Sequence, residues 1–267
     1  MIKELSIHGL RGFGQKQTIR FSVPDGTQAG SGLNVIVGAN NAGKTTIIEA
    51  IRAFNTPGTD TPSFSEGRRN ATSGRKVFLE LRDESDQSYK ISTVEKGGSS
   101  TKKEPPNFSL NNYVLQSRRY VSYEFGGGTN DRDSYIRNYQ KLENNRSNSL
   151  NNFNYRIFQI QKNKEQFDAF LEQVLGYKLN WTIDQRDNGQ FYIQYSENGL
   201  IHSSEGVGDG IWSIFTICDA LYDAKDNTSI LIDEPELSIH PALQRRLMKL
   251  FIEQSKHHLT RAYREKK

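Results

Sequence analysis

The sequence predicts an α/β fold with a mainly parallel core sheet, and three observations predict it. The apolar run from Leu33 to Val37 has the length and composition of a buried strand. The next residues, Gly38 to Thr45, match the pattern G-x-x-x-x-G-K-[ST]. Apolar side chains then recur at helical spacing as far as Phe54. A strand, a glycine-bounded loop and a helix in this order are typical of a phosphate-binding loop.

The chemistry of this loop favours a nucleoside triphosphate. Gly38 and Gly43 let the backbone turn tightly, so that successive N–H groups and a helix N-terminus converge on an anion. Lys44 can reach the β- and γ-phosphates, and the Thr45 hydroxyl can bind Mg²⁺. We therefore expect the following residues to bind ATP: Gly38, Asn40, Asn41, Ala42, Gly43, Lys44, Thr45 and Thr46.

A second apolar strand, Ser229 to Asp233, ends in acidic residues. A carboxylate at the end of a buried strand beside a phosphate loop can bind Mg²⁺, often through water, so we assign Asp233 to the metal. The neighbouring Glu234 points differently and can orient or deprotonate the attacking water. Glu234 and Lys44 are therefore the expected catalytic residues.

A small-residue loop from His202 to Gly210 precedes the apolar helix predicted from Ile211 to Tyr222. Such a loop, which carries hydroxyl groups and opens a helix, can form a second phosphate-binding terminus. An ordinary capped helix is the alternative.

Composition limits the class of protein. The 267 residues allow one large core or two lobes, and only 34% are hydrophobic, with a mean hydropathy of −0.72. We expect no membrane span and no signal peptide. Cys218 is the single cysteine, so we expect no disulfide and a reducing cytoplasm. The net charge of +4 permits contact with DNA without demonstrating it.

The remaining elements follow from alternation and turn residues. Leu5 and Ile7 alternate with polar neighbours, which predicts a β-hairpin before the phosphate loop. We predict loops over 56–75 and 96–107, and over 126–154 either a mobile loop or polar helix ends around Tyr135 to Leu142. No long heptad run occurs, which excludes a long coiled-coil arm. Further predicted elements are the strand pair Val77–Leu81 and Tyr89–Val94, the strand Tyr113–Ser117, the helix Lys164–Leu175 stopped by Gly176, the hairpin Leu179–Asp184 and Phe191–Tyr195, and a helix through Leu243, Leu247, Leu250 and Phe251.

The three motifs together resemble the ATP-binding-cassette (ABC) ATPases, most closely the SMC, RecF and OLD group of non-transport heads, including OLD-like, defence-associated AAA family ATPases. The resemblance covers both ends of the chain well and residues 55–180 only loosely. It rests on the opening Ile2–Phe13, the loop Gly38–Thr46, the signature-like Ser203–Gly210, the string Asp233-Glu-Pro-Glu-Leu-Ser-Ile-His-Pro241, and Gln116–Tyr120.

The resemblance implies an antiparallel β lobe and a helical insertion beside the parallel core. The single split head would comprise residues 1–95, 96–178 and 179–267. Such heads form head-to-tail homodimers that sandwich ATP, so Ser204 and Gly206, with Ser203 and Gly208 as further candidates, would contact the γ-phosphate of the partner's ATP. Gln116 would sense Mg²⁺ and the γ-phosphate. His240, before Pro241, is expected to help start the following helix.

The C-terminal segment departs from the family pattern. Family members add a further apolar strand and a histidine that contacts the γ-phosphate, which we would expect near residue 266. Residues 256–267 are basic and lack an apolar run, so we expect both the final strand and this switch histidine to be absent. Turnover would then be slow or dependent on a partner.

The resulting hypothesis is a cytoplasmic, Mg²⁺-dependent ATPase head that dimerises around ATP. It would regulate an effector or nuclease partner or a DNA-processing partner, plausibly in antiviral (phage) defence. One rival is a nucleotide-gated scaffold that does not hydrolyse ATP. A second is a P-loop kinase or GTPase, against which stand the signature-like loop and the lack of a guanine-reading N-K-x-D motif.

Overall fold

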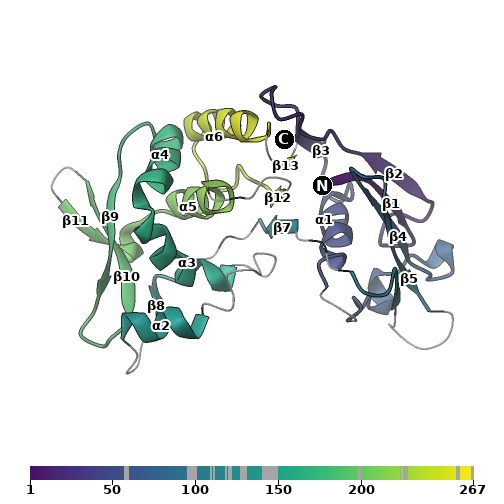
Figure 1. Ribbon diagram of the computed structural model, residues 1–267, viewed down its shortest axis with the longest axis horizontal. Coiled ribbons are helices and arrows are strands. Elements are labelled where there is room, and N and C mark those ends of the chain that lie inside the picture. The colour runs from purple at the N-terminus through teal and green to yellow at the C-terminus, as the bar shows by residue number, and fades with distance from the viewer. Residues whose placement is uncertain are drawn as a thin grey trace. The chain divides into compact units, whose positions relative to one another are not determined.

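The chain forms two compact units, each made of segments that are distant in sequence. Unit 1 comprises residues 1–114, 225–234 and 252–267, and unit 2 comprises residues 115–224 and 235–251. Figure 1 labels most of the helices and strands of both units. The computed structural model describes residues 1–56, 60–94, 101–108, 110, 112–117, 119, 122–126, 131–139, 150–197, 200–222, 224, 228–256 and 259–265.

Unit 1 contains an antiparallel sheet with the strand order β2-β1-β4-β5-β6. Leu5 and Ile7 of β1 lie opposite Leu81 and Leu79 of β4, and all four are buried on one face. The alternation therefore sets the register, and the predicted hairpin and strand pair are confirmed. The bounds are β1 Ile2–His8, β2 Gln17–Arg20, β4 Phe78–Asp83, β5 Ser88–Thr93 and β6 Thr101–Glu104.

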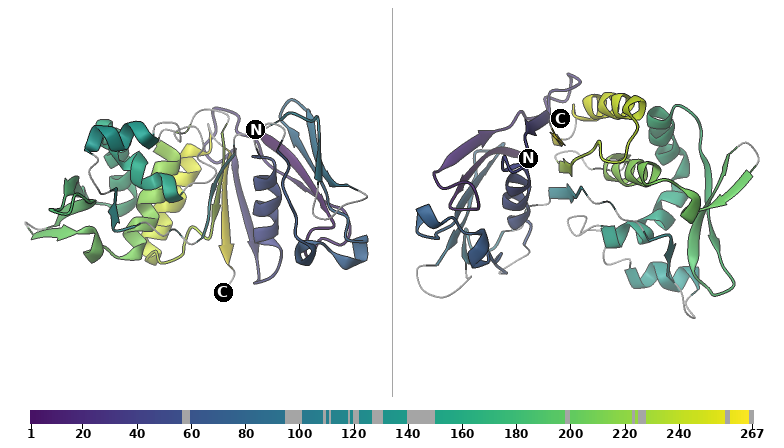
Figure 2. Two further views of the ribbon diagram at one scale, coloured as in Figure 1. Left: turned by 90° about the horizontal axis from the view of Figure 1, so that it is seen from below. Right: turned by 180° about the vertical axis from the view of Figure 1, so that it is seen from behind.

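The core sheet of unit 1 has the order β3-β13-β12-β7, with β13 parallel to both of its neighbours. The helix α1 (Lys44–Ala53) lies between this sheet and the antiparallel sheet (Figure 2). Its side chains are buried on more than one face because it contacts both layers. The bounds are β3 Leu33–Gly38, β7 Asn112–Leu115, β12 Ser229–Asp233 and β13 Leu259–Glu265.

The expectation that the final strand is absent is wrong. β13 pairs through Thr260–Glu265 with β3 and through Leu259–Tyr263 with β12. A polar sequence can occupy this central place because the backbone N–H and C=O groups of both neighbours hold it, whereas parallel strands usually consist of apolar runs. The expected position of the switch histidine, residue 266, lies outside the described residues, as do His257 and His258.

Two predicted loops contain regular structure. β6 lies inside the range 96–107, so the prediction of an exposed loop there is wrong in part. Thr101 and Lys103 are buried, and the Lys103 ammonium donates to the carbonyls of Thr56 (2.7 Å) and Phe108 (2.9 Å). The loop 56–75 contains two short 3₁₀ turns, η1 (Glu66–Arg68) and η2 (Ala71–Ser73).

Unit 2 combines helices with a small antiparallel sheet in which β10 pairs with β8, β9 and β11. Phe167, Trp181, Phe215 and Tyr222 pack edge to face in its core, with ring centroids 5.3–5.9 Å apart. The bounds are β8 Glu124–Phe125, α2 Arg132–Tyr139, α3 Leu150–Lys162, α4 Lys164–Leu175, β9 Asn180–Gln185, β10 Phe191–Glu197, β11 Leu200–Ser203, η5 Ser204–Gly206, α5 Asp209–Tyr222 and α6 Pro241–Gln254.

The predicted helix Lys164–Leu175, its stop at Gly176 and the following hairpin are confirmed. Gly176 adopts φ +82°, the left-handed conformation that closes a helix. Within 126–154, α2 (Arg132–Tyr139) confirms the helical alternative in part, and the sequence did not predict α3, which begins at Leu150. Among the described residues, no helix is both long enough and apolar enough to span a membrane.

Candidate functional site

The phosphate loop joins β3 to α1 as predicted, and Gly43 decides its shape. Gly43 is the residue before the helix and has φ +93°, which disfavours any side chain. A Cβ there would also lie 3.0 Å from Cε2 of Phe13. Asn41 has φ +62°. The loop therefore curls so that the first amides of α1 open toward one cavity, the geometry that favours an anion.

Lys44 is held by its own loop. Its Nζ donates to the carbonyl oxygens of Gly38 (2.8 Å) and Ala39 (3.0 Å). These two bonds hold the ammonium at the loop. A phosphate that enters the cavity can replace them with charge-assisted hydrogen bonds, which are stronger.

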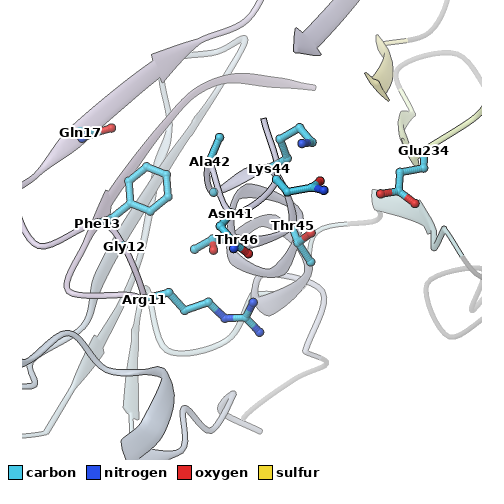
Figure 3. Close-up of a pocket in the computed structure, with 12 residues that line it drawn as sticks. Arg11, Gly12, Phe13, Gln17, Asn41, Ala42, Lys44, Thr45, Thr46 and Glu234 are labelled. Carbon is cyan, nitrogen blue, oxygen red and sulfur yellow. The ribbon is translucent and has the colours of Figure 1, made fainter. Parts of the chain in front are cut away.

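A cavity of about 520 Å³ opens in front of the loop. This volume lies in the range of small-molecule sites. Glu234 follows β12 directly, has φ +45°, and turns its carboxylate toward the loop residues (Figure 3). The cavity is lined by Arg11, Gly12, Phe13, Gln17, Asn40, Asn41, Ala42, Gly43, Lys44, Thr45, Thr46 and Glu234.

The structure thus brings the phosphate loop and Glu234 to one cavity, and it adds four residues that sequence reasoning did not assign to the site: Arg11, Gly12, Phe13 and Gln17. Arg11, Gly12 and Phe13 come from the segment after β1, which the hairpin prediction treated only as a turn, and Gln17 is the first residue of β2. A signal was present, because Arg11 is a basic residue between Gly9, Gly12 and Gly14, where a chain is able to approach a ligand closely.

Asp233, the predicted metal residue, is the last residue of β12 and is half-buried. The cavity lining includes its neighbour Glu234 but not Asp233 itself. Thr45, the other predicted metal residue, does line the cavity. Among the described residues no group of three or more His, Cys, Asp or Glu side chains could hold a metal alone. Mg²⁺ usually combines one or two carboxylates with phosphate oxygens and water.

The signature-like loop lies in unit 2, between β11 and α5. Ser204 is only 1% exposed, and its hydroxyl donates to the carbonyl of Tyr123 at 2.6 Å. Gly206 is exposed and Ser203 is half-buried. Of the two serines, Ser203 therefore presents the more accessible hydroxyl, while Ser204 fixes the loop.

The start of α5 also meets the loop that follows Glu234. A Cβ on Gly210 would lie 2.5 Å from the carbonyl oxygen of Ser238, which itself has φ +63°. Only glycine fits this approach. His240 acts as the expected structural residue, since its Nδ1 accepts the N–H of Ala242 (3.3 Å) at the start of α6, with Pro241 in the first helical position.

Gln116, the predicted sensor, follows β7 directly and is exposed. Its carbonyl accepts a bond from Arg119 (3.1 Å), whose guanidinium also donates to the Ser213 hydroxyl of α5 (3.0 Å). The backbone around Gln116 is thereby fixed to the helix that follows the signature-like loop. Gln116 as a nucleotide sensor stays a prediction.

The fold is similar to that of solved SMC heads. An SMC head bound to the C-terminal winged-helix domain of ScpA has a TM-score of 0.63 at 13% identity, covering 99% of this chain and 89% of that chain. The SMC head domain from Thermotoga maritima has a TM-score of 0.52 at 16% identity, covering 99% of this chain and 89% of that chain. A third structure is an Smc head with an extended coiled coil, bound to the C-terminal domain of ScpA derived from Pyrococcus furiosus. It has a TM-score of 0.59 at 13% identity, covering 99% of this chain and 89% of that chain. These similarities confirm the predicted α/β fold of the ABC-ATPase type.

The sequence places the chain in a family. No curated protein matches it. A family model described as "AAA domain, putative AbiEii toxin, Type IV TA system" matches residues 33–263, a range that contains the phosphate loop, the signature-like loop and Glu234. This family and this fold are those of nucleotide-binding ATPase domains. The chain belongs to this AAA domain family.

Proposed function

We propose that this chain binds Mg-ATP in the cavity of unit 1 and hydrolyses it to ADP and phosphate. One observation carries the proposal: the phosphate loop and Glu234 line the same cavity, although they are 190 residues apart in sequence (234 − 44). A cavity with convergent N–H groups, one lysine and one carboxylate has the groups that phosphoryl transfer to water requires.

Each group has a role in this proposal. Lys44 and the amides of Asn41–Thr46 bind the phosphates and hold the γ-phosphorus in place. Thr45 and Asp233 would hold Mg²⁺, which when bound neutralises charge on the phosphates. Glu234 accepts a proton from a water molecule and orients the oxygen of that water toward the γ-phosphorus. Arg11 lies at the cavity wall and would add a second positive charge.

The proposal extends to a head-to-tail homodimer, in which the signature-like loop of one copy closes the cavity of the other. The exposed Gly206 and the half-buried Ser203 support this role for the loop, since both can approach a phosphate on a partner. The family resemblance supports it as well. Ser204 would then position the loop from inside through its bond to Tyr123.

A regulatory role would follow from ATP-dependent dimerisation. The family description names a toxin of a type IV toxin–antitoxin system, and two of the similar SMC heads were solved bound to ScpA. We propose that this OLD-like head likewise acts through a partner protein, an effector or nuclease, in defence against phage. Contact with DNA stays a prediction, since charge alone supports it.

Mixing two inactive variants tests both the site and the dimer. Lys44→Ala removes the phosphate ligand, and Gly206→Asp puts a carboxylate where a partner's phosphate would lie. Gly206 has an ordinary φ and its Cβ would be 3.6 Å from the Tyr195 hydroxyl, so the fold tolerates the change.

Each variant alone should lack ATP turnover. The mixture should recover about a quarter of the wild-type rate, because half of the random dimers would contain one intact composite site of two. No recovery, with each variant folded and with wild-type protein active under the same conditions, would contradict the shared site.

A further inference from the structure

Three charged side chains form a continuous ion-pair cluster beside the phosphate loop. Glu49, in the second turn of α1, binds Arg11 through Oε2 (Nη2 at 3.0 Å) and Arg68 through Oε1. The Glu49 side chain is 18% exposed, whereas those of Arg11 and Arg68 are 40% and 50% exposed. One carboxylate on the nucleotide-binding helix therefore holds two arginines that come from other segments.

The backbone fixes the same three segments to one another. Arg11 has φ +47°, and its N–H donates to the carbonyl of Arg68 at 2.7 Å. Its own carbonyl accepts a bond from Nδ2 of Asn70 at 2.6 Å. The backbone N–H and C=O groups of Arg11 are thus both hydrogen-bonded to the segment that contains η1 and η2. These bonds also fix the position of the Arg11 Cβ.

Arg11 is the member of the cluster that lines the cavity. Figure 3 shows its side chain extending past Thr46, with Lys44 on the other side of the loop. A guanidinium has five N–H donors. Glu49 uses Nη2 only, and within the described part of the chain Nε and Nη1 of Arg11 have no hydrogen-bond partner. Glu49 thus holds one edge of the Arg11 guanidinium, and the N–H groups of the other edge are available to a ligand.

We propose that Glu49 is a positioning residue: it holds the Arg11 guanidinium at the cavity wall so that its open edge binds the phosphates of the nucleotide. This inference rests on the proposed nucleotide site. Arg68 binds the second carboxylate oxygen of Glu49. Arg11 therefore cannot use both oxygens of Glu49, and part of its guanidinium stays available to a phosphate. A long side chain fixed before binding loses less conformational freedom when the phosphate arrives.

The sign of one substitution separates this role from the simplest alternative. If Glu49 were only a negative charge near the phosphates, Glu49→Gln would remove a repulsion and tighten nucleotide binding. If Glu49 positions Arg11, the same change releases the guanidinium and weakens binding. Glutamine has nearly the same shape, and both arginines are solvent-accessible, so the variant leaves no buried unpaired charge and should fold.

The experiment is a double-mutant cycle. Affinity for Mg²⁺ with β,γ-imido ATP is measured for the wild type, Glu49→Gln, Arg11→Gln and the double variant, with melting temperatures as the folding control. We expect each single variant to bind about 5–20-fold more weakly, and the double variant to bind no more weakly than Arg11→Gln. Inorganic triphosphate should lose affinity by the same factor as the nucleotide, because Arg11 acts on the phosphates.

Tighter binding by Glu49→Gln would overturn the proposal. So would an effect of Glu49→Gln that persists unchanged in the Arg11→Gln background, since Glu49 would then act through another group. Failure of the wild type to bind the nucleotide would instead contradict the proposed function itself. The two failures are therefore distinguishable in one series of titrations.

Discussion

The phosphate loop and the signature-like loop both lead from a strand into a helix, yet they differ in what they offer a ligand. The first curls through Gly43, places Lys44 beside it and faces a cavity of about 520 Å³. The second turns its Ser204 hydroxyl inward to Tyr123, and α5 begins with the acidic Asp209. An acid in the first turn already compensates the helix dipole and repels a phosphate.

This difference shows that a helix N-terminus does not make an anion site by itself. The helix α1 has no acid in its first turn, so its amides keep their attraction for phosphate. The helix α5 is buried from Trp212 to Tyr222, as an apolar helix inside a unit is. The first loop therefore has the features of a primary phosphate site, and the second lacks them.

The largest expected effect comes from Lys44→Ala. It should weaken Mg-ATP binding about 100-fold or more, since charge-assisted bonds to two phosphates are lost. Stability should change little, because in the described part of the chain the hydrogen-bond partners of the Lys44 ammonium are two carbonyls of its own loop. Titration calorimetry measures the affinity. The control is Lys3→Ala, which removes one positive charge from β1 of the antiparallel sheet. Equal losses in both variants would show that only net charge matters.

The next effect contrasts one glycine from each loop. Gly43→Ala should cost about 1–3 kcal/mol of stability and impair ATP binding, because the alanine must adopt φ +93° and meets Phe13. Gly208→Ala should leave stability within ~0.5 kcal/mol, since among the described residues no atom beyond its chain neighbours would lie within 4 Å of the added Cβ. Urea denaturation measures both. A destabilised Gly208→Ala would mean that the second loop is as tightly built as the first.

A smaller effect distinguishes the two serines. Ser204→Ala should lower the free energy of unfolding by about 1 kcal/mol, because the Tyr123 carbonyl loses its donor. Ser203→Ala should keep full stability and instead weaken ATP-dependent dimerisation, as measured by light scattering. The reverse assignment, with Ser204→Ala stable but monomeric, would place the contact with the partner at Ser204.

The smallest effect concerns the buried thiol of α5. Burial, and then the charge of Asp219, raise the pKa of Cys218 above its ordinary value of 9.0. The folded protein therefore keeps a proton that the unfolded chain releases. The contribution of Cys218 to the free energy of unfolding is complete below pH 9 and is lost as the pH rises above it. The wild type should lose ~0.8 kcal/mol more than Cys218→Ala between pH 7.5 and pH 9.5. Equal losses would indicate that the thiol is accessible.

Periodicity and turn residues were sufficient wherever local sequence decides structure. They predicted the phosphate loop, the helix from Lys164 to Leu175 and the hairpin of β9 and β10. They failed for β13, whose place is set by backbone pairing with β3 and β12 rather than by apolar side chains. They also missed Arg11, because a turn after β1 reaches the cavity only once the antiparallel sheet is folded.

ATP turnover of the wild type and Glu234→Gln, recorded with the mass of each protein with and without Mg-ATP, tests the central claim most directly. The account predicts turnover by the wild type, its loss in Glu234→Gln, and an ATP-bound dimer trapped by the variant. ATP-dependent dimerisation of the wild type without any turnover would contradict it and would identify a nucleotide-gated scaffold instead.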